Sequence, residues 1–262
     1  MRPSKLTHAP LHRLLSKLGL ASRTQAVDFV SAGRVRVNGQ RAFDPARWHT
    51  WDSLIEIDGE RRVATPRLFA LHKRRGVVTA RVDAREKVVC DHLALQQTGC
   101  VPVGRLDKES EGLLLLTNDT LLADRLTSPR SHVPKTYHVR VSRSLHADEL
   151  KALGSTIDLG GELTRPSAWT SMVAERNPNW VHVKLHEGKN RQIRRMLHTL
   201  GVGVQRLVRV AIGPLELGAL ARGAVRELGA AELGQLQRAL SETCSQNLRG
   251  PSSVRGVSVL GW

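Results

Sequence analysis

The sequence has few of the residues that disulfide scaffolds, zinc knuckles and membrane spans need. Its 262 residues include only three cysteines, Cys90, Cys100 and Cys244. Their number is odd and none forms a Cys-x-x-Cys pair, so their spacing predicts neither a disulfide framework nor a zinc site. No apolar run approaches the length of a membrane span, and the first ten residues lack the apolar stretch of a secretory signal. We therefore expect a cytoplasmic protein with no membrane partner.

Acidic residues are also scarce. The chain has 24 Asp and Glu against 40 Lys and Arg, which gives a formal net charge of +16. A small-molecule enzyme does not need such an imbalance, whereas a polyanion is attracted by it, so nucleic acid is the predicted partner. Aromatic residues make up only 3% of the chain, yet hydrophobic residues reach 40%, enough for a core without covalent staples. The length fits one medium domain plus a small one.

The segment 104–119, GRLDKESEGLLLLTND, differs most from ordinary globular sequence. Its four consecutive leucines, ended by Asn118, predict a short strand buried on both faces. Gly104 and Gly112 flank Asp107 and permit backbone conformations that other residues resist. Asp107 is therefore expected on a constrained loop beside a core strand, where a carboxylate either pairs with a cation or takes part in chemistry. The residues alone leave both interpretations open.

The first sixty residues read as a small unit of two helices and a few strands. Leucines at helical spacing predict a helix over 11–18, and Ser22 with Gln25 has the capping-box pattern of a second helix. The Asn38-Gly39 pair predicts a hairpin turn.

Charge in this unit is lopsided, because residues 1–47 hold nine Lys or Arg against two acids. Charge kept for solubility is one interpretation, although solvated helix faces usually mix both signs. The run RLLSKLGLASRTQAVDFVSAGRVRVNG resembles the S4 RNA-binding domain, whose paired helices present basic residues to structured RNA. Contacts of that kind position a protein on RNA without selecting sequence. The resemblance implies RNA contacts by Arg13, Lys17, Ser22, Arg23 and Arg34.

The segment around Asp107 carries a second resemblance. GRLDKESEGLLLLTND is similar to the signature of the RsuA-type ribosomal RNA pseudouridine synthases, in which the aspartate is catalytic. The resemblance implies that Asp107 acts on a flipped-out uridine and that Arg105 reaches the RNA backbone or the gap left by the nucleotide. The family's Asn-Lys-Pro loop corresponds here to HKRRG at 72–76. That loop keeps Lys73, expected to contact a phosphate, but has arginines where the proline and its neighbour would be.

Two further segments extend the family pattern. In KTYHVRV at 135–141, alternation puts Tyr137 on the apolar face of a strand, where a core tyrosine would also fit. The segment nevertheless resembles the second family motif, in which the tyrosine ring stacks on the target base, and Lys135 is expected to contact RNA beside it. By contrast, His182 and His186 share one face of a strand predicted over 180–187, and we interpret both as solvent-facing rather than as metal ligands.

The segment EGKNRQIRRM begins a predicted helix with one apolar stripe and one basic stripe. Like charges at this spacing repel one another, so an opposing anion is expected. A solvated cationic face is the alternative. The segment is close to the third family motif, in which Arg194 pairs with the catalytic aspartate. The RNA contacts expected here are Lys189, Asn190, Arg191 and Arg195.

The resemblances cover roughly residues 8–235 and imply an α+β fold. A small N-terminal S4 RNA-binding domain precedes a pseudouridine synthase catalytic domain with a mixed, mainly antiparallel central sheet. The expected boundaries are 8–58 for the S4 domain, 59–66 for a linker, 67–235 for the catalytic domain and 236–262 for a flexible tail.

The implied reaction isomerises a uridine to pseudouridine. It involves neither redox change nor group transfer, so we expect no cofactor and no metal. KESEGL and Asn190 look most like the RluF-type enzymes, which implies action on large-subunit (23S) ribosomal RNA or a ribosomal assembly intermediate, with transfer RNA as a further substrate. Separately, we expect a monomer. Two alternatives stay open. One is a non-catalytic S4-type RNA-binding or ribosome-assembly factor, which Arg74 and Arg75 favour. The other is a DNA-binding helix-turn-helix, which leaves the Asp107 and Arg194 segments unexplained.

Overall fold

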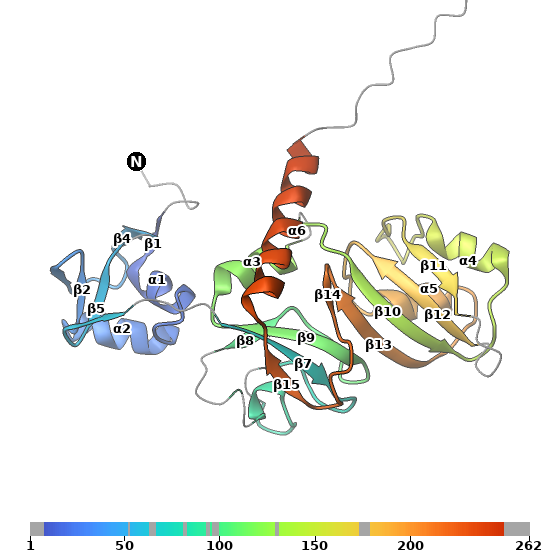
Figure 1. Cartoon of the computed structure of the whole chain (residues 1–262), viewed down its shortest axis with the longest axis horizontal. Coiled ribbons are helices and arrows are strands. Elements are labelled where there is room, and N and C mark those ends of the chain that lie inside the picture. Colours follow the sequence, from blue (N-terminus) through green and yellow to red (C-terminus); the bar gives the residue numbers. More distant parts are fainter. Residues whose placement is uncertain are drawn as a thin grey trace, which may run out of the picture.

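The fold is α+β, as expected: a small N-terminal unit precedes a larger domain built on a nine-stranded mixed sheet (Figure 1). The computed structural model describes residues 8–51, 53–62, 67–80, 83–92, 95, 100–128, 131–172 and 179–248. Within these ranges no helix combines the length and apolar character that a membrane crossing requires.

The N-terminal unit packs two helices on two small sheets. Its elements are β1 (His8–Pro10), α1 (Leu11–Lys17), α2 (Arg23–Ser31), β2 (Val35–Val37), β3 (Gln40–Ala42), β4 (Trp48–Thr50), β5 (Ile55–Ile57) and β6 (Glu60–Arg62). Helix α2 begins as its sequence predicts, because the Ser22 hydroxyl accepts a hydrogen bond from the Gln25 backbone N–H and the Gln25 side chain accepts one from Ser22. Leucines of α1 and Ala26 and Val30 of α2 are fully buried.

The large sheet has the strand order β11-β12-β10-β13-β9-β7-β15, with β14 paired to β13 and β8 paired to β9. All its pairings are antiparallel except that of β13 with β9. The strands are β7 (Leu68–Lys73), β8 (Val101–Val103), β9 (Glu111–Thr117), β10 (Lys135–Val141), β11 (Ala168–Ser171), β12 (Trp180–Leu185), β13 (Val204–Ile212), β14 (Leu215–Glu216) and β15 (Val225–Glu227).

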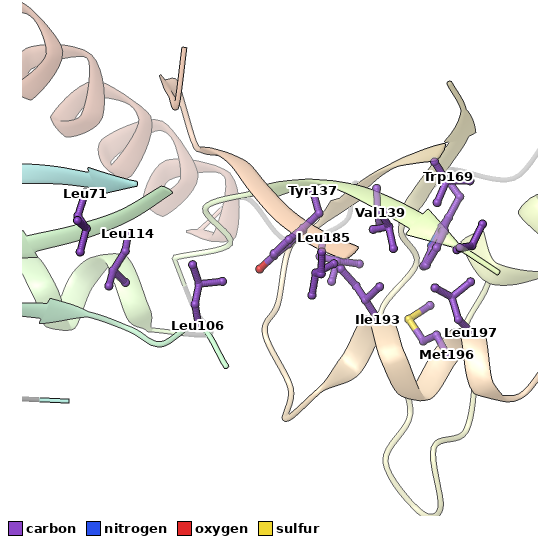
Figure 2. Close-up of a cluster of buried hydrophobic side chains, with 14 of the residues drawn as sticks. Leu71, Leu106, Leu114, Tyr137, Val139, Trp169, Leu185, Ile193, Met196 and Leu197 are labelled. Atoms are coloured by element: carbon purple, nitrogen blue, oxygen red, sulfur yellow. The ribbon is translucent and has the colours of Figure 1, made fainter. Parts of the chain in front are cut away.

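Helices cover the two faces of this sheet at opposite ends. α3 (Thr120–Thr127) and α6 (Ala230–Leu248) pack on one face over β7 and β9, in a core that includes Leu115 and Leu236. α4 (Ala147–Gly154) and α5 (Gln192–His198) pack on the other face, where Val139 of β10 meets Met196 and Leu197 (Figure 2). A one-turn 3-10 helix, Val89–Asp91, completes the described helices.

The four-leucine strand is the centre of the domain, as predicted. Leu113–Leu116 in β9 are each no more than 1% exposed. Strands β9 and β13 share only two pairs, Glu111 with Val208 and Gly112 with Arg209. A Cβ on Gly112 would lie 2.3 Å from the Arg209 carbonyl oxygen, and the φ of +108° also favours glycine there. Beyond this close contact β9 and β13 no longer pair.

Two of the expected boundaries need correction. β6 pairs with β5, so residues 60–62 belong to the N-terminal sheet rather than to a linker, while 63–66 lie outside the described residues. Helix α6 continues to Leu248 and buries Leu236 and Leu240. These leucines, one helical turn apart, complete the core over β7 and β9, so a tail cannot begin at 236. Residues 249–262 lie outside the described part of the chain.

Candidate active site

A cleft of about 760 Å³ opens where β9 and β13 part. Its walls come from the loop before β9, the end of α3, strands β10 and β13, and the segment from β12 into α5. Asp107, Tyr137 and Arg194, which lie far apart in the sequence, all line this cleft. The fold thus brings the three residues of the sequence hypothesis to one hollow.

The backbone of the Asp107 loop is held from below by Lys73, the last residue of β7. The Lys73 side chain is only 1% exposed. Its Nζ donates to the carbonyl oxygens of Ser110 at 2.8 Å, Asp107 at 3.0 Å and Arg74 at 3.1 Å. Burial lowers the pKa of this ammonium to about 8, and the nearby Asp107 carboxylate opposes that shift. Lys73 therefore supports the loop and is not accessible to a phosphate, which corrects the expected RNA contact.

Other contacts fix the same loop from its sides. The Thr79 hydroxyl donates to the Leu106 carbonyl at 2.6 Å and accepts from the Leu106 N–H at 3.2 Å. Gly76 N–H donates to the Lys108 carbonyl at 2.8 Å, and Arg75 forms an ion pair with Glu109 at 2.7 Å. The arginine-containing loop after β7 therefore docks on the Asp107 loop.

The Asp107 carboxylate itself forms no hydrogen bond or ion pair with any residue that the structure describes. Arg194, expected to pair with it, instead donates to the carbonyl oxygens of Glu109 at 3.3 Å and Val204 at 3.4 Å. The expected direct pair is therefore wrong, because the guanidinium bridges the end of the Asp107 loop and the start of β13 and does not reach the carboxylate. Burial, and then the neighbouring Arg191, lower the pKa of Arg194, while Asp107 acts in the opposite direction. The two groups thus interact through space across the cleft.

Tyr137 forms part of the cleft wall on β10. It is 9% exposed and lies directly opposite Arg209 on β13. Figure 2 shows its hydroxyl oxygen directed away from the packing of Val139 and Leu197, toward the side where Leu106 lies. The ring is thus packed on one side and open to the cleft on the other.

Arg209 is a cleft residue that sequence reasoning missed. It is 5% exposed, and its Nε donates to the Leu113 carbonyl at 2.7 Å. The cleft also contains Lys135, whose pKa is lowered to about 8 by burial and then by Arg209. A charged residue inside the apolar run LVRVAI was the available signal for Arg209.

The rim of the cleft is cationic. Arg105, Arg165, Lys189 and Arg191 line it together with Asn190. Its second acid, Glu187, accepts hydrogen bonds from the Gln192 side chain at 2.6 Å and the Arg165 backbone N–H at 2.9 Å.

Arg195, in contrast, lies away from the cleft. It forms an ion pair with Glu162 at 2.6 Å and donates to the Leu159 carbonyl. The expected RNA contact by Arg195 is therefore wrong. Adjacent positions of a helix point in different directions, so Arg194 lines the cleft while Arg195 ties α5 to the 159–162 turn.

The predicted S4 contacts divide into paired and open cations. Lys17 forms an ion pair with Asp124 of α3, and Arg34 pairs with Asp58 at 2.6 Å while its guanidinium lies 4.3 Å from the Phe29 ring centre. The remaining predicted contacts are Ser22, which caps α2, and the exposed Arg13 and Arg23.

A second hollow of about 260 Å³ lies between the N-terminal unit and the catalytic domain. Lys17 and Arg23 line it on one side, and Gly104 and Thr127 line both this hollow and the cleft. The second hollow therefore lies beside the cleft, with Gly104 and Thr127 in the wall of both.

The comparisons with known proteins agree with this architecture. The family model described as RNA pseudouridylate synthase matches residues 67–199, and the S4 domain model matches residues 10–47. An uncharacterized RNA pseudouridine synthase of Mycobacterium tuberculosis is 38% identical, over 88% of this chain and 93% of the relative. The ribosomal large subunit pseudouridine synthase B of Bacillus subtilis is 34% identical, over 88% and 96%.

A solved structure gives the same result. A crystal structure of a pseudouridylate synthase superposes with a TM-score of 0.63 at 26% identity, covering 86% of this chain and 98% of the other. The fold and the cleft therefore define an RNA-modifying enzyme with an S4 domain attached. The chain belongs to the RNA pseudouridine synthase family.

Proposed function

We propose that this enzyme isomerises a specific uridine of large-subunit ribosomal RNA, as a cytoplasmic monomer, with Asp107 as its catalytic carboxylate. The observation that carries the proposal is an acid without a protein partner among the described residues, on a rigid loop in a cationic cleft. The name of the Bacillus relative and the RluF-like residues support a large-subunit substrate. Transfer RNA is the second substrate to be tested.

The chemistry requires one well-placed carboxylate. The N1–C1′ bond breaks, the uracil turns, C5 bonds to C1′, and the proton lost from C5 is balanced by one gained at N1. Asp107 can attack C1′ as a nucleophile or remove a proton from the ribose. Both roles require the carboxylate to be ionised and directed, and the supported loop and the nearby cations supply these conditions.

The other cleft residues have complementary roles in this proposal. Flipping the target base costs a few kcal/mol, and the cationic rim offsets that cost by binding the flanking phosphates. Tyr137 stacks on the uracil, Arg194 directs positive charge toward the Asp107 side of the cleft, and Arg105 occupies the gap that the flipped nucleotide leaves. The S4 cations Arg13 and Arg23 hold more distant RNA.

A non-catalytic binding factor was the main alternative, and Arg74 and Arg75 were its support. Both arginines have structural partners here: Arg75 pairs with Glu109, and Arg74 donates to the Arg222 carbonyl at 3.2 Å. Arg75 thus adds a contact to the Asp107 loop and Arg74 ties the same segment to the turn before β15, so both arginines are accounted for without a non-catalytic role.

A tritium-release assay tests the proposal. Full-length 23S ribosomal RNA, 16S ribosomal RNA and bulk transfer RNA, each transcribed with [5-³H]uridine, are incubated with the purified chain. We expect tritium release from the 23S transcript, with the modified position mapped by carbodiimide-dependent primer extension. Folded protein that binds these RNAs but releases no tritium from any of them would support the non-catalytic factor instead. Release from transfer RNA alone would overturn the ribosomal assignment.

A further inference from the structure

One face of the sheet is left without a helix where β10, β12 and β13 lie side by side. Tyr137, Val139 and Val183 point to the face that α5 covers. On the reverse face, α3 and α6 pack over β7 and β9 instead, through Leu115 and Leu236. Figure 1 shows β10, β12 and β13 without a helix in front of them, and α6 standing to one side. In the described part of the chain no helix packs on this reverse face of β10 and β12, where Arg140 and Lys184 are exposed and Trp180 is half-buried.

The open sheet face carries rings and cations in adjacent positions. Arg140 lies directly opposite Trp180 on one neighbouring strand and Arg206 on the other. His138 lies opposite His182, with ring centres 5.7 Å apart. Opposite residues on one sheet face have Cβ atoms about 5 Å apart, so these side chains form one surface. We define the open sheet face as His138, Arg140, Trp180, His182, Lys184 and Arg206.

Charge on this face is unbalanced. Arg140 and Lys184 are exposed, and neither forms an ion pair with a described residue. Arg206 pairs with the buried Glu111, which Arg222 also approaches at 3.7 Å, and its guanidinium lies 5.8 Å from the Trp180 ring centre. Among the described residues, a further acid nearby is Glu216, on β14 beyond β13.

His138 and His182 add polar rings to the same face. Burial, and then His182, lower the pKa of His138, so this ring is neutral at pH 7. A neutral imidazole offers one hydrogen-bond donor and one acceptor. The face therefore combines an indole ring, imidazole groups able to bond base edges, and two cations, Arg140 and Lys184, that pair with no acid among the described residues.

We propose that the open sheet face binds an unpaired segment of the substrate RNA, on the side of the sheet opposite the catalytic cleft. Unpaired bases stack on aromatic side chains displayed by a sheet, and cations beside them hold the phosphates. Trp180 takes a base, and Arg140 and Lys184 take the adjoining phosphates. The inference rests on the proposed function only in taking RNA as the ligand.

Binding of a fluorescein-labelled twelve-nucleotide oligouridylate to the full chain tests this assignment by anisotropy. We expect Trp180→Ala to weaken binding about 5- to 10-fold, and Trp180→Phe to restore most of it, because base stacking tolerates any aromatic ring. Thermal melts confirm that both variants are folded. Equal affinity of wild type and Trp180→Ala would overturn the stacking role.

The phosphate contacts have a matched charge control. The double variant Arg140→Gln/Lys184→Gln is expected to reduce the slope of log affinity against log salt by about 1.4, roughly 0.7 for each phosphate that the protein no longer neutralises. Lys151→Gln/Arg238→Gln removes the same charge from exposed positions on α4 and α6 and leaves the slope near that of wild type. The same slope for both doubles would overturn the proposal.

Two more readouts separate this inference from the proposed function. Tritium release from the 23S transcript reports catalysis independently. If the enzyme is active but the variants bind oligouridylate as tightly as wild type, the open sheet face is not an RNA site and the proposed function still stands. Cross-linking with 4-thiouridine RNA is expected to label the peptide that contains Trp180 and His182. Variants that bind RNA normally but fail to bind intact large subunits would assign the face to a ribosomal protein, which contradicts the proposal.

Discussion

The cations of the N-terminal unit and those of the cleft are held in different ways. In the N-terminal unit, Lys17 and Arg34 pair with carboxylates near the surface. At the cleft, Arg209 lines the wall and Lys73 lies beneath the Asp107 loop, and both are buried and donate to backbone carbonyls. A carbonyl acceptor satisfies the hydrogen bond without cancelling the charge, so the positive potential remains for Asp107 and RNA. On the proposed function, surface cations add affinity for RNA, whereas the buried ones also hold the Asp107 loop.

Among the variants that distinguish buried cations from surface cations, Lys73→Met is expected to have the largest effect on stability and activity. The loop carbonyls then lose a charged donor while staying buried, which costs about 3 kcal/mol of unfolding free energy. Activity is expected to fall with it, since the Asp107 backbone is no longer held. Urea unfolding and tritium release measure both effects. Lys108→Met removes an exposed lysine of the same loop, paired with Glu86, and serves as the control; similar midpoints for the two variants would contradict the role of Lys73.

Gly112→Ala tests the close contact that places Arg209 beneath the cleft. The added Cβ would lie 2.3 Å from a backbone oxygen at a φ of +108°. Strain and crowding of this kind destabilise by roughly 2 to 3 kcal/mol. Gly229→Ala is the matched control, because a Cβ added there would meet no heavy atom within 4 Å outside its immediate neighbours and the φ is not positive. Thermal melting of the two variants at the same midpoint would show that β9 can move away from β13.

The pH dependence of folding stability and of RNA binding distinguishes the cleft cations from the surface ones. Lys135 has a folded pKa of about 8, below the ordinary 10.5. Between these values the unfolded chain binds more protons, so stability rises with pH from about 8 to 10.5. RNA phosphate favours the ammonium, so binding takes up a proton in that window. Calorimetric titrations at pH 8.5, in buffers of different ionisation enthalpy, measure the uptake.

The variants for this experiment are Lys135→Met and the exposed Lys184→Met. The first is expected to reduce proton uptake and the second to retain it, because Lys135 lines the cleft with a pKa lowered by burial, whereas Lys184 is exposed on the other face of the sheet. Equal uptake in both variants would mean that RNA phosphate does not approach Lys135.

The smallest effect is expected at the S4 surface. Arg13→Gln/Arg23→Gln removes exposed cations, and affinity for the 23S transcript is expected to fall about 3- to 10-fold, with a shallower salt dependence. Single-turnover rates at saturating protein stay unchanged. Arg34→Gln is the comparison, since its guanidinium is already paired with Asp58. If filter binding shows a larger loss of RNA affinity for Arg34→Gln than for Arg13→Gln/Arg23→Gln, paired cations contribute more to RNA binding than open ones, which contradicts this prediction.

Local patterns in the sequence predicted much of the fold. The Ser22 capping box, the buried leucines of β9 and the inward face of β10 are all present. Each depends on residues a few positions apart, so a single sequence contains the needed information.

The features that were missed depend on distant contacts. The sequence predicted that Lys73 lies in a cationic surface loop, because its burial requires β7 to pair with β9, about forty residues further along the chain. The place of Arg209 depends on Gly112, and that of Arg195 on Glu162. Such pairings bring segments together through the sheet, and no local periodicity records them.

Single-turnover conversion of the 23S transcript by Asp107→Asn tests the central claim most directly. We expect the rate to fall by roughly 10²- to 10⁴-fold, the range for loss of a proton-transferring side chain. RNA affinity is expected to stay within about 3-fold of wild type, because phosphate contacts dominate binding. Asp148→Asn, on the exposed start of α4, should convert normally. Conversion by Asp107→Asn at the wild-type rate would contradict the account.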